Sequence, residues 1–424
     1  MEPTTDFREQ ALGTGVHVVG QPMDGVESVA VGFLIGTGAR DEMAPSFGIS
    51  HFTEQMLFRG TEHMNARQLS ERFDGLGISY DSSTGLEMTL VNGVLLGDTL
   101  PAALDLLADC LRYPAFPEDE VESVRTLMVQ ELRQRDDRPA QRVMDTLRQQ
   151  FFRDTPCGHD VLGSEESIKT LTVVDLRRYW EDRYTANNMT LSVAGNIDWE
   201  RTLEQLEVLT ASWPTGRGRM SLEPPITNPG ITVMYKEAAQ ENIGFAFPGV
   251  PVGDPDYYAA GLAAQVLGGG TNSRLFREVR EKRGLAYAVQ ARFDGLEKTG
   301  LFRVYVGTSA DRAHESVEVV MDELRNFERS GITDDELKLA KTRLKSQVLM
   351  RSESTLSRMA ANLRSWWFEH KLYSLQALKE EIDRVTVEQI QSLVGNLCIT
   401  ENLAAVALGP RNEDQLFGGV VARA

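Results

Sequence analysis

A histidine, a glutamate and a glutamine stand within five residues of one another, as His51, Glu54 and Gln55 in the segment HFTEQ. If this segment is helical, positions i, i+3 and i+4 lie on one face of the helix. Two imidazoles one turn apart can hold a zinc ion, and a carboxylate between them can take a proton from the metal-bound water. Here Gln55 occupies the position of the second imidazole. The segment therefore predicts a hydrolytic metal site that lacks one ligand.

The elements that must position these residues occur twice in the chain. Residues 172–195, TVVDLRRYWEDRYTANNMTLSVAG, align without a gap with residues 386–409, TVEQIQSLVGNLCITENLAAVALG. Each segment begins with Thr-Val, which is typical of a helix N-cap and first turn, and ends in an alternating strand. Upstream, two helical segments that begin near Pro117 and Thr333 each have an acidic first turn. A repeat of this length predicts the duplication of a whole domain.

The stretch between the two halves, residues 213–230, is rich in Gly, Pro and polar residues, as is typical of a linker. We therefore expect an N-terminal domain over residues 1–212, which carries the incomplete zinc motif, and a homologous C-terminal domain over residues 231–424. Alternating strands and long helical patterns occur in each half without regular β–α alternation. This pattern predicts an α+β fold in which helices cover a mostly antiparallel sheet.

The surroundings of the HFTEQ segment are informative beyond these five residues. Residues 47–64, FGISHFTEQMLFRGTEHM, resemble the zinc motif of the pitrilysin/insulinase family of zinc peptidases, in the bacterial branch that resembles the mitochondrial processing peptidase. The segments VLGSEESIKTLT (161–172) and GGGTNSRLFREVREKRGLAYAV (268–289) extend the resemblance over nearly the whole chain. The resemblance implies two homologous domains that close like a clamshell over a peptide.

The resemblance also implies roles for individual residues. His51 would be a zinc ligand, Glu54 the general base, and Glu131, which lies 76 residues after position 55, the distal zinc ligand. Gln55 breaks this ligand set, because a neutral amide oxygen is a poor donor to zinc compared with an imidazole. Val124 is a second departure, since family members usually have an acidic residue there. We therefore expect zinc to be weakly bound or absent in this chain.

In the second half, Arg280 and Tyr287 match a pair of residues that binds substrate and supports the tetrahedral intermediate in the family. A guanidinium and a phenol can both donate hydrogen bonds to a developing oxyanion. Some members of the family divide the zinc motif and this pair between two subunits, so the resemblance implies a subunit that binds peptide and supplies Arg280 and Tyr287 to a heteromeric zinc endopeptidase. Such a subunit would form a homo- or heterodimer with a zinc-competent homologue.

Two other functions remain open, so the sequence does not decide whether the chain is an enzyme. The chain can be a zinc metalloendopeptidase in its own right, with Gln55 or water completing the metal coordination, or with Gln55 as an engineered change. It can also be a non-catalytic peptide-binding or scaffold subunit.

The composition limits the class of partner. The chain of 424 residues has a formal net charge of −18, which argues against nucleic-acid binding. No apolar run approaches the length of a membrane span, and the N-terminal stretch MEPTTDFREQ does not have the pattern of a signal peptide. Three cysteines without a C-x-x-C pair fit reduced thiols. We therefore expect a cytoplasmic protein that binds a peptide or an unfolded protein segment, and neither nucleic acid nor membrane.

Overall fold

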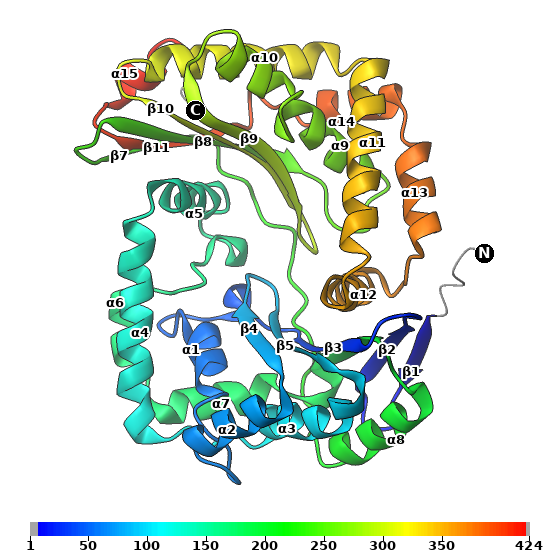
Figure 1. Ribbon diagram of the computed structural model, residues 1–424. Helices are drawn as coiled ribbons and strands as arrows, with labels where there is room; N and C mark the ends of the chain where they lie inside the picture. Colours follow the sequence, from blue (N-terminus) through cyan, green and yellow to red (C-terminus); the bar gives the residue numbers. More distant parts are fainter. Residues whose placement is uncertain (1–6, 421–424) are drawn as a thin grey trace. The chain divides into compact units, whose positions relative to one another are not determined.

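The computed structural model describes residues 7–420, which form two compact units (Figure 1). Unit 1 contains the described residues up to Leu132, together with His159–Ser221 and Leu349–Leu375. Unit 2 contains Arg133–Gly158, Leu222–Val348 and the described residues from Gln376 onwards. The beginning of the polar N-terminal stretch lies outside the described residues. Within residues 7–420, no helix combines the length and the apolar character that crossing a membrane requires.

Each unit is built on one open sheet. The strand order is β1-β2-β6-β3-β5-β4 in unit 1 and β7-β11-β8-β10-β9 in unit 2. Neighbouring strands are antiparallel except in the pairs β2–β6 and β7–β11. The strands are β1 (Arg8–Ala11), β2 (His17–Pro22), β3 (Ser28–Ile35), β4 (Ser79–Thr84), β5 (Thr89–Leu96), β6 (Met189–Gly195), β7 (Gly230–Tyr235), β8 (Gln240–Gly249), β9 (Ala286–Gly295), β10 (Gly300–Ser309) and β11 (Ala404–Gly409). The predicted α+β class with mostly antiparallel sheets is confirmed.

Helices cover the sheets of both units. Unit 1 contains η1 (Ala39–Asp41), α1 (Ile49–Met56), α2 (Ala66–Leu76), η2 (Gly97–Thr99), α3 (Leu100–Arg112), α6 (Glu165–Thr170), α7 (Val173–Arg183), η4 (Ala186–Asn188), α8 (Trp199–Thr210) and α12 (Thr355–Glu369). Unit 2 contains α5 (Pro139–Phe151), η3 (Pro156–Gly158), α9 (Tyr257–Gly268), the π-helical turn η5 (Phe276–Glu281), α10 (Ala313–Ser330), α13 (Leu375–Arg384), α14 (Val387–Asn396) and α15 (Glu413–Phe417). Two long helices pass from one unit to the other, α4 (Glu118–Asp136) and α11 (Asp334–Arg351).

The sequence repeat corresponds to a structural repeat. Thr172 caps α7 by accepting a hydrogen bond from the backbone N–H of Asp175, and Thr386 caps α14 in the same way from Gln389. Each of these helices is followed by a buried strand, β6 or β11, as the two aligned segments predict. The acidic first turns of α4 and α11 are also at the predicted places.

The two units exchange one helix each. Helix α5, from the first half of the sequence, packs on β8 and β11 of unit 2, whereas α12, from the second half, packs on β3 and β6 of unit 1 (Figure 1). Residues 213–229, within the predicted linker, form neither helix nor strand. The bounds of the compact units differ from the continuous ranges expected from the repeat, 1–212 and 231–424, which remain a prediction.

Strand β3 is buried on both faces, which explains its nearly continuous apolar sequence. Val31 and Phe33 belong to the core on one face, and Ala30 and Leu34 pack against α12 on the other. Gly32 lets α12 approach closely, because a Cβ there would overlap the sulfur of Met359. The corresponding glycine of unit 2, Gly244 on β8, lies in the same way under α5. The loop after β3 leads through η1 to α1, so this packed strand anchors the helix that carries His51 and Glu54.

Candidate active site

Helix α1 is almost completely buried, and its N-terminus is fixed by a buried carboxylate. Glu42 accepts hydrogen bonds from the backbone N–H groups of Gly48, at 2.7 Å, and Ser50, at 2.9 Å. A negative charge is favourable at this end of a helix. Burial raises the pKa of Glu42 to about 7, although these hydrogen bonds act to lower it. Gly48 itself has φ of 88°, a left-handed conformation that favours glycine.

A second buried contact fixes the side of α1. The hydroxyl of Tyr179 on α7 lies 2.7 Å from Oγ of Ser50 and 2.7 Å from Oγ1 of Thr37. Burial raises the pKa of Tyr179, so this phenol stays neutral and can donate a hydrogen bond. Helix α1 is therefore held both by the chain that precedes it and by α7.

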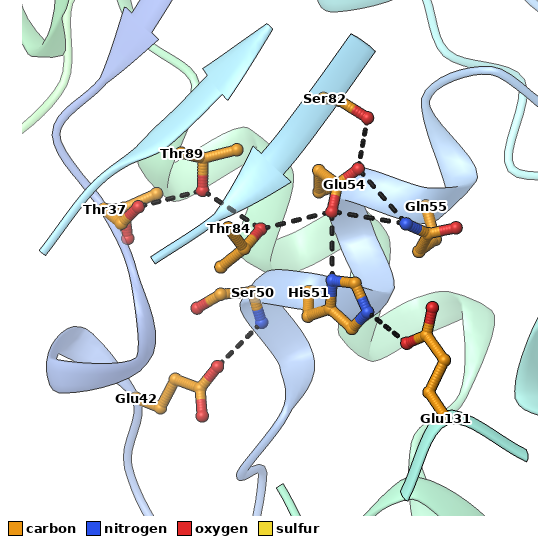
Figure 2. Close-up of polar contacts among 10 residues, drawn as sticks. All are labelled: Thr37, Glu42, Ser50, His51, Glu54, Gln55, Ser82, Thr84, Thr89 and Glu131. Carbon is orange, nitrogen blue, oxygen red and sulfur yellow. Dashed lines mark hydrogen bonds and ion pairs between the residues drawn. The ribbon is translucent and has the colours of Figure 1, made fainter. Parts of the chain in front are cut away.

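The imidazole of His51 lies between two carboxylates (Figure 2). Its Nδ1 is 3.0 Å from Oε2 of Glu54, and its Nε2 is 2.8 Å from Oε2 of Glu131 on α4. Burial by itself lowers the pKa of His51, but the hydrogen bonds and charges of Glu131 and Glu54 outweigh it and raise that pKa to about 9. As arranged, His51 is a cation at neutral pH. Glu54 and Glu131, the two carboxylates predicted for this site, thus each lie within hydrogen-bonding distance of His51.

Glu54 is completely buried, and two hydroxyls of β4 bind its carboxylate. Ser82 donates a short hydrogen bond to Oε1, and Thr84 donates a long one, 3.4 Å, to Oε2 (Figure 2). Neither residue was expected from the sequence. The signal available was the period-two pattern of SYDSST, which places Ser82 and Thr84 on one face of a strand.

Gln55 does not present a metal ligand. Its amide nitrogen faces Glu54, at 3.3 Å from Oε1 and 3.4 Å from Oε2. Turning the amide over would place its oxygen against the carboxylate, so Glu54 favours the orientation in which an N–H group faces the site. Catalytic zinc usually has three protein ligands, and here only His51 and Glu131 remain as strong donors. Over residues 7–420, no group of three His, Cys, Asp or Glu residues is arranged to hold a metal ion. The residues present therefore do not fit a catalytic zinc ion.

The position of the expected second acidic residue is apolar. Val124 on α4 is fully buried in a cluster that includes Phe52 and Met56 of α1. Packing with α1 therefore takes the place of electrostatic support from this position.

Arg280 and Tyr287 belong to unit 2. Arg280 lies on η5, is exposed, and has its guanidinium 5.0 Å from the ring centre of Phe276. Tyr287 is the second residue of β9, is 47 % exposed, and donates a hydrogen bond of 3.0 Å to Oε1 of Gln240. Its ring lies over Gly307, where a Cβ would be 2.6 Å from the phenol oxygen. Both side chains expose hydrogen-bond donors, and their predicted roles in substrate binding remain predictions.

Comparisons with known proteins agree with this geometry. The model of the insulinase family, peptidase family M16, matches residues 18–165, and the model described as the peptidase M16 inactive domain matches residues 170–344. The chain is 32 % identical over 396 residues to the "uncharacterized zinc protease YmxG" of Bacillus subtilis, covering 93 % of this chain and 96 % of that protein. It is 31 % identical over 409 residues to the "uncharacterized zinc protease Rv2782c" of Mycobacterium tuberculosis, covering 95 % and 93 %.

Solved structures share the fold. A peptidase M16 inactive domain from Pseudomonas fluorescens superposes with a TM-score of 0.89 at 23 % identity, covering 96 % of this chain and 98 % of that one. A protease from Helicobacter pylori gives a TM-score of 0.88 at 19 % identity, covering 96 % and 100 %. The full-length similarity to relatives named as zinc proteases, on this fold and with this helix motif, shows that the chain belongs to the insulinase family, peptidase family M16.

Proposed function

We propose that this chain is a peptide-binding subunit of a heteromeric zinc endopeptidase, to which it contributes Arg280 and Tyr287 rather than a zinc ion. The observation that carries the proposal is the amide of Gln55, which turns an N–H group toward Glu54 where a second imidazole would bind the metal. Without a tightly held zinc ion the attacking water is not acidified, and Glu54 has little to act upon.

Arg280 and Tyr287 suit a role at a partner's substrate. The guanidinium of Arg280 makes no hydrogen bond or ion pair with any other residue of the described chain, so its donors are free for a ligand. The phenol of Tyr287 donates to the side-chain oxygen of Gln240 and also interacts with Tyr305, and it can donate to a ligand by leaving Gln240. Two such donors can stabilise the negative charge of a tetrahedral intermediate on a peptide that a zinc-competent homologue cleaves. The ligand would be an extended peptide or an unfolded protein segment.

One observation supports a second candidate function. Glu54 and Glu131 each lie within hydrogen-bonding distance of His51, so only one ligand separates this site from a complete zinc motif. The chain would then be a zinc endopeptidase on its own, with water or a reoriented Gln55 completing the coordination. Restoring the imidazole by Gln55→His gives a direct reference for such an enzyme.

The two functions are separated by a mixing experiment. The purified chain, a zinc-competent homologue from the same organism, and an equimolar mixture of both are assayed on an unfolded peptide. Activity well above that of the homologue alone is expected only in the mixture, and Arg280→Ala should abolish this gain. Lys282→Gln, an exposed change two residues after Arg280, is the matched control and should keep this gain. Hydrolysis by the chain alone that is lost in Glu54→Gln would instead favour the autonomous enzyme, and no activity in any arm would favour a scaffold.

A further inference from the structure

A cavity of about 710 Å³ lies entirely within unit 2. Its walls are formed by the end of α9, by η5 and by the first half of α11, together with the loop of residues 269–273, which we call the glycine-rich loop. None of His51, Glu54, Glu131, Arg280 and Tyr287 lines it. Its volume is in the range of cavities that bind small ligands or a few residues of a peptide.

Two arginines line this cavity without a partner. Neither Arg277 on η5 nor Arg343 on α11 makes an ion pair or a side-chain hydrogen bond with another residue of the described ranges. Nearby Arg274, in contrast, is neutralised by Glu336, with two bonds of 2.6 and 2.7 Å. Asp335 is the other carboxylate in the lining. Three guanidiniums and two carboxylates leave a local charge of +1 in a chain whose net charge is −18.

The glycine-rich loop makes room for one of these arginines. A Cβ at Gly270 would overlap the guanidinium of Arg343, so the absence of a side chain at this position allows the guanidinium to pack against the loop. A planar guanidinium with free N–H groups matches the two oxygens of a carboxylate. The loop thereby places a carboxylate-binding group at the wall of the cavity.

Two further features of the lining favour a ligand that has an N–H group and an apolar part in addition to a negative charge. The amide oxygen of Gln265 is buried and has no hydrogen-bond donor within residues 7–420, which is costly for a polar atom. The terminal torsion of a glutamine is soft, so a small rotation can offer this oxygen to a ligand N–H. Beside it, Val266, Leu339 and Ala340 form an apolar wall, and Leu339 is 58 % exposed.

We propose that this cavity binds the C-terminal residue of a peptide. The terminal carboxylate would bind Arg277 and Arg343, its N–H would reach Gln265, and an apolar side chain would pack on Val266 and Leu339. A single negative charge matches the local charge of +1, and the apolar wall suits a side chain better than it suits a hydrated phosphate. The peptide nature of the ligand rests on the proposed function.

The test uses a small probe that carries a carboxylate, an N–H group and an apolar side chain. Binding of N-acetyl-leucine and of N-acetyl-leucinamide to the full chain is compared by ligand-observed NMR titration. The free acid should bind roughly tenfold more tightly than the amide, because only the acid forms charge-assisted hydrogen bonds. Arg343→Gln and Arg277→Gln should each reduce binding of the acid to the level of the amide. Arg72→Gln, an exposed arginine change on α2, is the matched control and should leave it unchanged.

Several results would overturn the proposal. These are equal binding of acid and amide, no binding of the acid, or unchanged binding in both arginine variants with an unchanged melting temperature. Displacement of the acid by inorganic phosphate at much lower concentration would assign the cavity to phosphate instead. The probe requires neither a partner nor hydrolysis, so a bound acid with an inactive subunit mixture would refute the proposed function alone. An active mixture with no bound acid would refute this inference alone.

Discussion

Glu54 shows how strongly single residues are constrained in this site. Its carboxylate is completely buried, contacts His51, and accepts hydrogen bonds from Ser82 and Thr84. A buried charge is tolerated only when hydrogen bonds and opposite charges replace its hydration. The hydroxyls of β4 therefore support the carboxylate whether or not a metal is bound.

Substitution of Ser82 tests this support. Ser82→Ala leaves Oε1 of this buried carboxylate with only the long, 3.3 Å contact from the amide of Gln55, so the free energy of unfolding should fall by about 1–3 kcal/mol. Urea denaturation followed by circular dichroism at pH 7 measures the change. Ser83→Ala, on the exposed face of the same strand, should change the stability by less than about 0.5 kcal/mol. Equal effects of the two substitutions would show that the hydroxyl of Ser82 does not support Glu54.

The buried carboxyl of Glu42 gives a prediction about pH. Its pKa rises from the usual 4.5 to about 7 on folding, so the folded chain binds its proton more tightly than the unfolded chain does. The contribution of Glu42 to stability is therefore greatest below pH 4.5 and declines as the pH rises to about 7. The stability of the wild type relative to Glu42→Gln should fall across this window, by up to about 1.4 kcal/mol per pH unit. Urea denaturation of both proteins at several pH values measures this difference, and a difference independent of pH would contradict the assigned pKa.

At the residue scale, the sequence identifies those side chains of the site that belong to a motif with fixed spacing. His51 and Glu54 share a face of α1, and the family resemblance points to Glu131; all three lie together. Ser82 and Tyr179 could not be predicted in this way, because tertiary packing alone brings β4 and α7 to α1.

At the element scale, the close contact between β3 and α12 depends on Gly32. Gly32→Ala would push its Cβ into Met359 and Leu363, and overpacking of this kind should lower the free energy of unfolding by about 1–3 kcal/mol. Gly75→Ala on α2 is the matched control, since its Cβ would meet no atom within 4 Å and a helix interior favours alanine. Thermal unfolding should show a lower Tm for the first substitution only. Relief of the defect by Met359→Ala would assign it to this contact, and an unchanged Tm in Gly32→Ala would contradict the packing.

The helix exchange marks the limit of sequence reasoning about elements. The similar segments LRQQFF (147–152) and LRSWWF (363–368) lie in equivalent places of the two halves, at the end of α5 and within α12. An apolar helix face shows that a partner is needed, but it does not show which sheet covers that face. The continuous ranges inferred from the linker therefore differ from the compact units.

At the scale of the whole molecule, the exchange makes the two halves of the sequence depend on each other. A fragment that ends at Ser221 lacks α12, which buries Ala30, Leu34 and Ala194 of the unit 1 sheet. Expressed alone, this fragment should expose that apolar face and should not unfold cooperatively, whereas co-expression with residues 222–424 should restore a stable complex. Size-exclusion chromatography and thermal circular dichroism measure both properties. A fragment that is monomeric and melts cooperatively on its own would contradict this dependence.

The central claim is that the motif centred on His51 and Glu54 lacks the ligand needed to hold zinc. The direct measurement is the zinc content of the purified full-length chain after dialysis against a weak chelator, by inductively coupled plasma mass spectrometry. We expect far less than one zinc ion per chain, and close to one in Gln55→His, because a lost ligand should weaken binding at least about 10–100-fold. Gln141→His, an exposed change on α5, should not raise the zinc content. One zinc ion per wild-type chain that survives dialysis, with peptide hydrolysis that Glu54→Gln abolishes, would contradict the claim.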